Sequence, residues 1–217
     1  MERFVDIEQI SDGKSYTVND MVKIGCNDCE GCSACCHDMG GLITLDPLDV
    51  ANLCEATGMS FDELSAGGHI DLIVDEGVII PALKMDEKRN ACTFLNDKGR
   101  CAVHQSRPGI CRLFPMGRLY EDNTHTYFLQ KDECGATLKT KVKLKAWIGI
   151  SNISVYEKYV DAWHYFVKEV KESIAGMDEE TVKKIDMFLL HQFYITPYSE
   201  NFYGDFYSRL EKCRSVF

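Results

Sequence analysis

Apolar residues in the last third of the chain recur at three- and four-residue spacing, which is the period of one face of an α-helix. The clearest stripe runs from Val155 to Ile174 and ends at Gly176. Asp178 then precedes a second periodic stretch as an N-cap residue, and Pro197 precedes a third. The pattern predicts three consecutive helices that pack through their apolar faces.

Up to about residue 135 the apolar runs are short, and turn-forming residues separate them. Short apolar or β-branched runs bounded by Gly, Asp or Asn are typical of strands. We predict an edge hairpin near the N-terminus, then a single strand, then a second hairpin that turns at Glu76–Gly77. The predicted strands are 4–7 with 16–18, 42–45, and 69–75 with 78–84.

Two short helices are predicted between these strands. Asp46 is an N-cap residue followed by a first-turn proline, and the helix that it begins covers 47–57 and ends at Gly58. Ser60 with Glu63 three residues later forms a capping box, which begins the second helix.

Length and composition fit one ordered domain. The chain has 217 residues, of which 45% are hydrophobic and 27% are charged, so a core can form without disulfide or metal staples. We therefore expect an α+β fold in a single domain, 1–217, with a cysteine-rich subdomain over 1–135 and a helical subdomain over 136–217.

Charge and hydropathy narrow the function classes. The formal net charge of -10 argues against a general nucleic-acid binder, since phosphate contacts require a basic surface. Four alternating lysines between Lys139 and Lys145 are interpreted as a solvated face. The N-terminus shows no export signal and no apolar stretch has spanning length, so we expect a cytoplasmic protein without a membrane segment.

The eleven cysteines are the most unusual feature of the composition. The first five crowd into one loop, although free cysteine is normally scattered through cores. Repeated Cys-x-x-Cys spacing lets two thiolates of one tight loop reach one metal. The odd count and the missing export signal disfavour disulfides. The predicted metal ligands in this loop are Cys26, Cys29, Cys32, Cys35 and Cys36.

A second group of cysteines follows at a distance. A turn at 96–99 places Cys92 and Cys101 on adjoining segments, so the two thiols can converge on one metal. Cys54 lies on the apolar face of a predicted helix and Cys213 near the end of the chain, so neither is assigned to the site. The remaining predicted ligands are Cys92, Cys101, Cys111 and Cys134.

The two groups together resemble the YkgJ family of cysteine-cluster proteins, described as zinc- or iron-chelating domains. The matching motifs are Cys-x-x-Cys-x-x-Cys-Cys over 29–36 and Arg-Pro-x-x-Cys-Arg-x-Phe-Pro over 107–115, and the resemblance covers about 26–135. Ser33 stands where the family often has glycine. The cysteine pattern is also similar to that of flagellin lysine-N-methylases, but no Gly-x-Gly-x-x-Gly motif follows a strand here, so methyl transfer does not carry over.

The residues leave two kinds of metal site open. The spacing of Cys26, Cys29, Cys32 and Cys36 is that of a bacterial ferredoxin, with His37 in place of the usual proline. Paired Cys-x-x-Cys elements equally suit a tetrahedral zinc site. Many thiols without paired histidines favour an iron-sulfur cluster, which is the first prediction, with zinc as the alternative.

Cationic side chains are expected near the thiols, because four thiolates around one divalent ion leave a charge of about -2. Arg112 is the predicted cofactor-binding residue, placed beside the ligands to compensate their charge. His37 and His104 are interpreted as structural, hydrogen-bonded histidines. Further candidates for charge compensation are Arg100, Arg107 and Arg118.

Three functions remain open from the sequence. The first is an enzyme that modifies a protein or peptide, with a metal in the cysteine-rich half and a pocket formed by the helical half. The second is a non-catalytic structural-zinc module that binds another protein. The third is a small electron carrier, for which the helical half is larger than needed. No catalytic residue is assigned, because no Ser-His-Asp order and no His-Glu-x-x-His motif is present.

Overall fold

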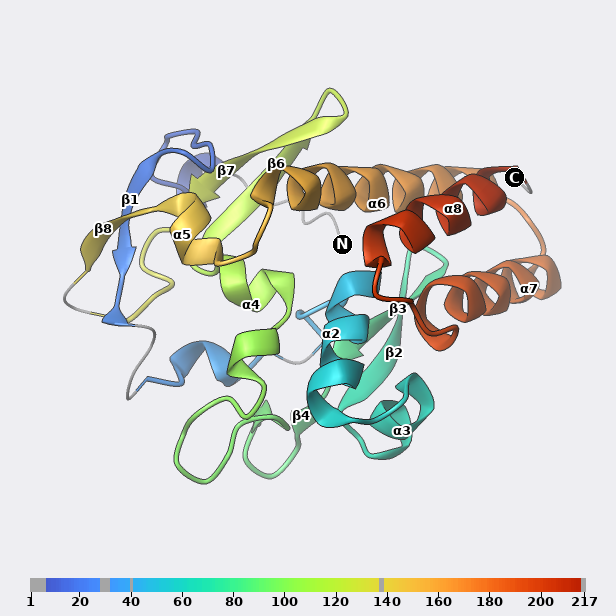
Figure 1. Ribbon diagram of the computed structural model, residues 1–217, viewed down its shortest axis with the longest axis horizontal. Helices are drawn as coiled ribbons and strands as arrows, with labels where there is room; N and C mark the ends of the chain where they lie inside the picture. Colours follow the sequence, from blue (N-terminus) through green and yellow to red (C-terminus); the bar gives the residue numbers. More distant parts are fainter. Residues whose placement is uncertain (1–6, 28–31, 40, 137–138, 216–217) are drawn as a thin grey trace.

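The computed structural model describes residues 7–27, 32–39, 41–136 and 139–215. Helices and short antiparallel hairpins are mixed along the chain, and the long helices gather in its C-terminal part (Figure 1). This arrangement confirms the predicted α+β fold. In the described part, no helix is both long and apolar enough to span a bilayer.

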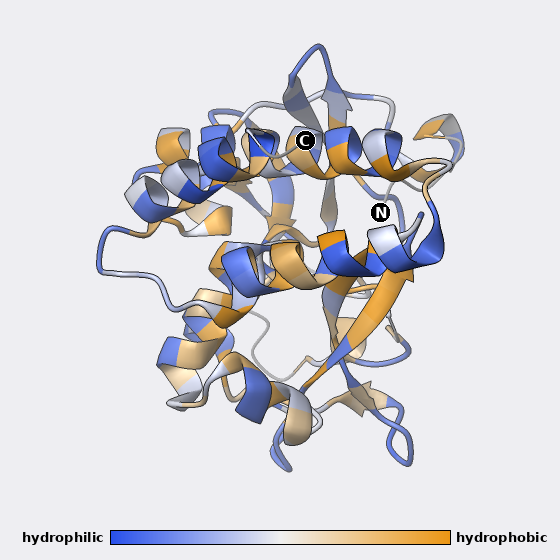
Figure 2. Ribbon diagram, turned by 90° about the vertical axis from the view of Figure 1, so that its right-hand side faces the viewer, coloured by the Kyte–Doolittle hydropathy of each residue, from blue (hydrophilic) through white to orange (hydrophobic). Residues whose placement is uncertain are grey.

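The three helices predicted in the last third of the chain are all present. Asp178 begins the second of them by accepting a hydrogen bond from the Thr181 N–H at 3.0 Å. In Figure 2 the long helices carry hydrophobic and hydrophilic residues on different sides. Their apolar sides meet around the fully buried Phe206, whose ring centroid lies 4.6 Å from that of Tyr159. The elements are α6 (Ile153–Ile174), α7 (Glu179–Leu190), its extension η4 (His191–Ile195) and α8 (Phe202–Arg214).

The short helices and the second hairpin of the N-terminal half also agree with prediction. Both helices begin with a capping box, and in the first the Asp49 N–H donates to Asp46 Oδ1 at 2.9 Å. The hairpin turns at Glu76–Gly77, where both residues have positive φ. The elements are α2 (Pro47–Thr57), α3 (Phe61–Ala66), β2 (Ile70–Asp75) and β3 (Val78–Leu83).

The predicted N-terminal hairpin is wrong. Ile7–Ile10 forms the short helix α1, and most of the predicted strand 4–7 lies outside the described residues. Tyr16 makes a bridge to Tyr127 instead of pairing with its own neighbours. The strand of this region is β1 (Met21–Gly25), which pairs antiparallel with β8 (Thr140–Lys143). The predicted strand 42–45 is reduced to one bridge, between Thr44 and Ala82.

A further hairpin was not predicted. It consists of β6 (Met116–Glu121) and β7 (Thr124–Leu129), joined by Asp122 and Asn123 at φ 49° and 61°. Two consecutive residues with positive φ match the twist of hairpin strands, so this dipeptide is the local signal for the turn. The other short elements are η2 (Ala34–Cys36), β4 (Met85–Asp86), β5 (Ala91–Cys92), η3 (His104–Ser106), α4 (Gly109–Leu113) and α5 (Leu144–Ile148).

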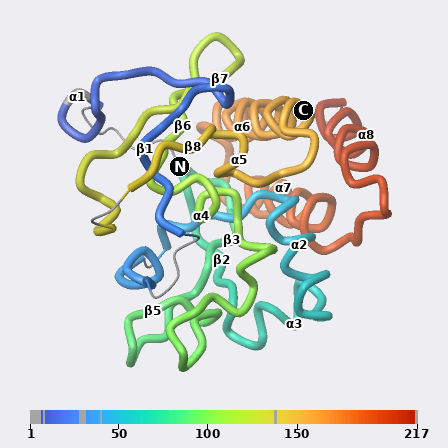
Figure 3. Tube along the Cα trace, turned by 60° about the vertical axis from the view of Figure 1, so that its left-hand side comes forward, coloured from blue at the N-terminus to red at the C-terminus, as the bar shows by residue number. Residues whose placement is uncertain are grey.

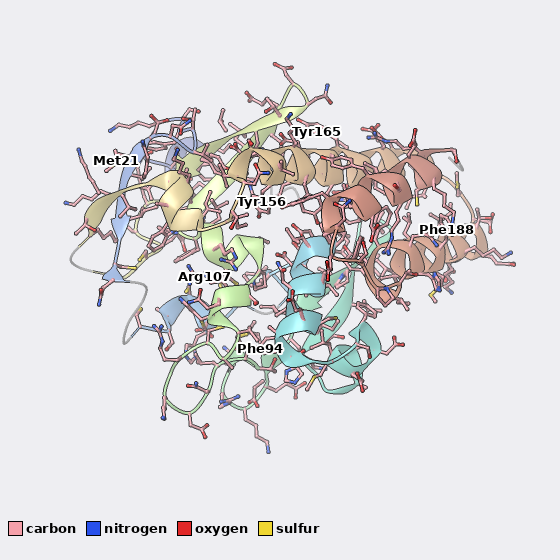
Figure 4. All side chains as sticks on the ribbon, in the orientation of Figure 1. Met21, Phe94, Arg107, Tyr156, Tyr165 and Phe188 are labelled. Atoms are coloured by element: carbon pink, nitrogen blue, oxygen red, sulfur yellow. The ribbon has the colours of Figure 1, made fainter. Side chains whose placement is uncertain are left out.

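Tyr159 joins α6 to α2. Its buried hydroxyl donates to Asp46 Oδ1 and accepts from the Leu48 N–H, each at 2.9 Å. Because Tyr159→Phe leaves both groups without this partner, we expect it to lower the free energy of unfolding by about 1–3 kcal/mol in urea denaturation. Tyr165→Phe is the control, since its hydroxyl donates an exposed hydrogen bond to the Thr124 carbonyl at 3.3 Å (Figure 4). Equal losses in the two variants would contradict this role.

Candidate metal centre

Six of the cysteines predicted as ligands line a single pocket of about 100 Å³. They come from three parts of the chain: the segment around η2, the region from β5 to the following turn, and α4. Their gathering is therefore a product of the fold and not of local spacing alone. The six are Cys32, Cys35, Cys36, Cys92, Cys101 and Cys111.

A single turn of 3-10 helix holds the first group. In η2 the Cys36 N–H donates to the Ser33 carbonyl at 2.8 Å, and the His37 N–H donates to the Ala34 carbonyl at 3.2 Å. A side-chain hydrogen bond with Cys36, followed by burial, raises the pKa of the Cys35 thiol above its usual range. The two adjacent thiols therefore reach the same pocket and interact directly.

Cys92 and Cys101 approach each other because the chain reverses at the predicted turn 96–99. Cys92 ends β5, and Cys101 lies opposite Leu95 in an antiparallel bridge. Burial is the largest cause that raises the pKa of each thiol. The sequence prediction that these two cysteines lie on adjoining segments is confirmed.

The third part of the pocket is α4, which carries Cys111. This helix has only five residues, so its position depends on contacts from outside. The Gly109 N–H in its first turn donates to Asp49 Oδ1 at 2.7 Å, and Asp49 is buried. A carboxylate of α2 thus fixes the start of the helix that presents the thiol.

The electrostatics of Cys111 show that four of the thiols lie close together. Burial is the largest cause that raises the pKa of this thiol. The pKa values of Cys35 and Cys101 are raised on balance, but the positive charge of Arg107 opposes the rise at both thiols. The further causes that raise the pKa of Cys111 are, in decreasing order, the charges of Asp49, Cys92, Cys35 and Cys101.

Arg112, the predicted cofactor-binding residue, does not line the pocket. Its Nε donates to the Arg107 carbonyl at 2.9 Å, and its Nη2 donates to the Gln105 carbonyl, so it ties α4 to the preceding loop. Arg100 and Arg107 line the pocket in its place, and Arg107 (labelled in Figure 4) lies 3.2 Å from His104 Nδ1. Two of the four arginines expected near the thiols therefore lie in the pocket wall.

Two predicted ligands of the described part, Cys26 and Cys134, are not among the pocket residues. Cys26 directly follows β1, and Cys134 follows β7, with its carbonyl accepting a hydrogen bond from Lys139 Nζ at 2.8 Å. Cys29 lies outside the described residues. The role of all nine cysteines as ligands stays a prediction. His104 lines the pocket, whereas His37 does not.

The donor set fits a thiolate-bound metal, although not as a ready-made site for one ion. Within the described residues, no three His, Cys, Asp or Glu side chains are gathered tightly enough to hold a single metal ion. Thiol ligands must lose their protons to bind a metal. Soft thiolates select zinc, copper(I) or iron-sulfur clusters. A pocket lined by six thiols therefore suits a zinc or iron centre held by thiolates.

Comparison with known families agrees with this geometry. Residues 28–135 match the family CxxCxxCC, described as "Putative zinc- or iron-chelating domain". This segment belongs to the CxxCxxCC family. All six pocket cysteines lie inside the matched range, so chelation of zinc or iron by cysteines is the chemistry of this domain. The chain matches no curated protein and no solved structure.

Metal binding is expected to strengthen as the pH rises. The pKa values of Cys35, Cys92, Cys101 and Cys111 are raised, so these thiols hold their protons at pH 7 and must release them to bind metal. While the pH is below the thiol pKa, each proton released on binding raises the apparent affinity for metal about tenfold for every unit of pH increase. Competition with a chromophoric zinc chelator at pH 6.5 and pH 8 measures this. An affinity that is independent of pH would contradict protonated thiols in the metal-free pocket.

Proposed function

We propose that the cysteine pocket binds an iron-sulfur cluster. One observation carries this proposal: six thiols from three parts of the chain line one pocket, while no three in the described part meet as ligands of a single ion. A cluster presents several iron atoms, each of which takes its own cysteine. It therefore suits thiols spread around a cavity better than a zinc ion, which needs four ligands around one point.

The residues between the thiols suit the surroundings of a cluster. Phe94, Phe114 and Trp147 form an apolar part of the wall that keeps water away from the sulfur atoms. The Trp147 Nε1–H donates to the Phe114 carbonyl at 3.2 Å, which fixes this wall. Arg100 and Arg107 supply positive charge beside the thiolates. A bound cluster supplies one-electron chemistry, with a potential that depends on such neighbours.

We further propose that this centre serves a reaction on a protein or peptide. Ile110 lines the pocket and is 37% exposed, so the pocket wall reaches the protein surface where a substrate side chain can approach. The proposal includes a location in the cytoplasm, because a reducing compartment keeps cysteine ligands in the thiol form.

The test is purification without oxygen and without added metal, followed by the visible spectrum and by iron, zinc and acid-labile sulfide per chain. Brown protein with matching iron and sulfide supports the cluster. A change in its electron paramagnetic resonance spectrum on adding a candidate peptide supports the reaction. A colourless protein with stoichiometric zinc contradicts the cluster and favours a structural-zinc module that binds another protein. A cluster that cycles between two redox states but ignores every peptide favours an electron carrier.

A further inference from the structure

The ribbon formed by β1 and β8 has one apolar and one cationic face. In its antiparallel register Val22 lies opposite Val142, and Val22 is buried in the core. On the other face Lys23 lies directly opposite Lys141. Because directly opposed residues of an antiparallel pair point to the same side, the two ammonium groups share one exposed surface.

The cationic face extends beyond this pair. Lys143 is opposite Met21, and Lys145 follows in α5. All three lysines of 141–145 are exposed, as is Met21 with 52% of its surface accessible. From 135 to 156 the sequence contains four lysines and no acidic residue, in a chain whose net charge is -10. We call Met21, Lys23, Lys141, Lys143 and Lys145 the basic face.

The lysines of the basic face have no acidic partners among the described residues. Ion pairs are formed by lysines elsewhere, such as Lys171 with Asp75 at 2.8 Å. Asp20, the acidic residue that precedes β1, accepts hydrogen bonds from the Thr17 N–H and hydroxyl at 2.7 and 2.8 Å instead. Like charges directly opposite each other destabilise a strand pair. An anionic partner would remove this repulsion.

We propose that the basic face is a docking surface for an acidic protein. Charge complementarity selects an anionic partner. The exposed Met21 beside Lys23 and Lys141 provides an apolar contact surrounded by charge, which is the composition of protein interfaces. The face lacks the arginines and aromatic rings that bind phosphates and stack on bases, which disfavours RNA or DNA as the partner. The proposal is independent of which metal the pocket holds.

The position of the basic face connects it to the cysteine pocket. β8 leads directly into α5, whose Trp147 lines the pocket, and β1 ends at the residue before Cys26. Figure 3 shows β1, β8 and α5 side by side, with α4 next to them. Met21 lies at the outer edge of this region in Figure 4. A protein bound to the basic face would therefore lie beside the wall of the metal pocket.

The test measures binding of fluorescent poly-L-glutamate by anisotropy in 50 mM salt, on the protein as purified. The double variant K23E/K141E is expected to weaken binding at least tenfold. The control K88E/K168E makes the same change of net charge at exposed lysines elsewhere in the chain. Its affinity for poly-L-glutamate should stay within about threefold of that of the parent, because separated surface charges are largely screened. Circular dichroism and metal content should not change in either double variant, which separates this test from that of the metal centre.

Polyuridylate and phosphatidylserine vesicles are the comparison probes. Tighter binding of either one than of poly-L-glutamate would overturn an acidic protein as the partner. Equal loss in both double variants, or no binding of poly-L-glutamate by the parent, would overturn the basic face as the site. If K23E/K141E binds normally but aggregates, the lysines protect the strand edges from pairing with other chains, and the proposal also fails.

Discussion

Replacing Cys111 with serine is expected to abolish stoichiometric metal binding. This thiol is partly buried, and its pKa is raised by burial, then by the charge of Asp49 and by those of three other pocket cysteines, so it stands where the thiols converge. Serine keeps the size of the side chain but supplies a hard oxygen that rarely loses its proton. A soft metal centre that loses one of its central ligands loses most of its affinity. Metal and sulfide analysis of the purified variant measures the effect.

Two further variants make this result specific. Cys32→Ser, in the first cysteine group, should also abolish stoichiometric metal binding, since Cys32 lines the same pocket from a different part of the chain. Cys54→Ser is the matched control, because Cys54 is half-buried on α2 and lies outside the pocket. Full metal content in both Cys111→Ser and Cys32→Ser would overturn the pocket as the metal site. An equal loss of metal in Cys54→Ser would point to a general folding defect instead of the loss of a ligand.

Local signals made much of the fold predictable. The helices that begin at Asp46, Ser60 and Asp178 all carry caps whose hydrogen bonds close within three residues. The turn at Glu76–Gly77 is similarly local, because glycine adopts the positive φ of Gly77 without steric cost. Such features depend on neighbouring residues only, so a single sequence contains all the information that they need.

The missed elements depend on partners distant in sequence. β1 pairs with β8, more than a hundred residues later, and no local pattern indicates that partner. The face of the β6–β7 hairpin towards α6 carries Arg118, whose guanidinium lies 5.5 Å from the centre of the Tyr156 ring. A polar, aromatic interface does not produce the alternation of apolar and polar residues on which strand prediction relies.

The candidate site shows the same division. Six of the nine cysteines selected by spacing and by the family resemblance line one pocket, and their role as ligands stays a prediction. Four arginines were expected near the thiols, and two of them, Arg100 and Arg107, line the pocket. Arg112 turns to backbone carbonyls instead. The direction of a long side chain is set by the surrounding fold. The sequence therefore names the candidate arginines but not which of them reach the pocket wall.

Gly109 lies in the first turn of α4, the helix that carries Cys111. Gly109→Ala is therefore expected to lower both the free energy of unfolding and the metal content. A Cβ atom at this position would lie 2.5 Å from the buried Tyr156 hydroxyl, so α4 must shift. Overpacking of this kind costs about 1–3 kcal/mol, and more where the neighbours are rigid. Tyr156 is rigid here, since it is 1% exposed and its hydroxyl accepts from Arg118 Nη2 at 3.0 Å. We expect a loss of about 3 kcal/mol in urea denaturation and a lower metal content.

A second substitution tests the cause. In Gly109→Ala/Tyr156→Phe the hydroxyl is absent, and the nearest remaining atoms to the new Cβ are Asp49 Oδ1 at 3.7 Å and the Tyr156 ring carbon Cζ at 3.8 Å, which are ordinary contacts. Tyr156→Phe alone should cost about 1–2 kcal/mol through the lost hydrogen bond to Arg118. The double variant should therefore be about as stable as Tyr156→Phe, with its metal content restored. Additive losses would contradict the steric explanation, because independent effects add and a relieved clash does not.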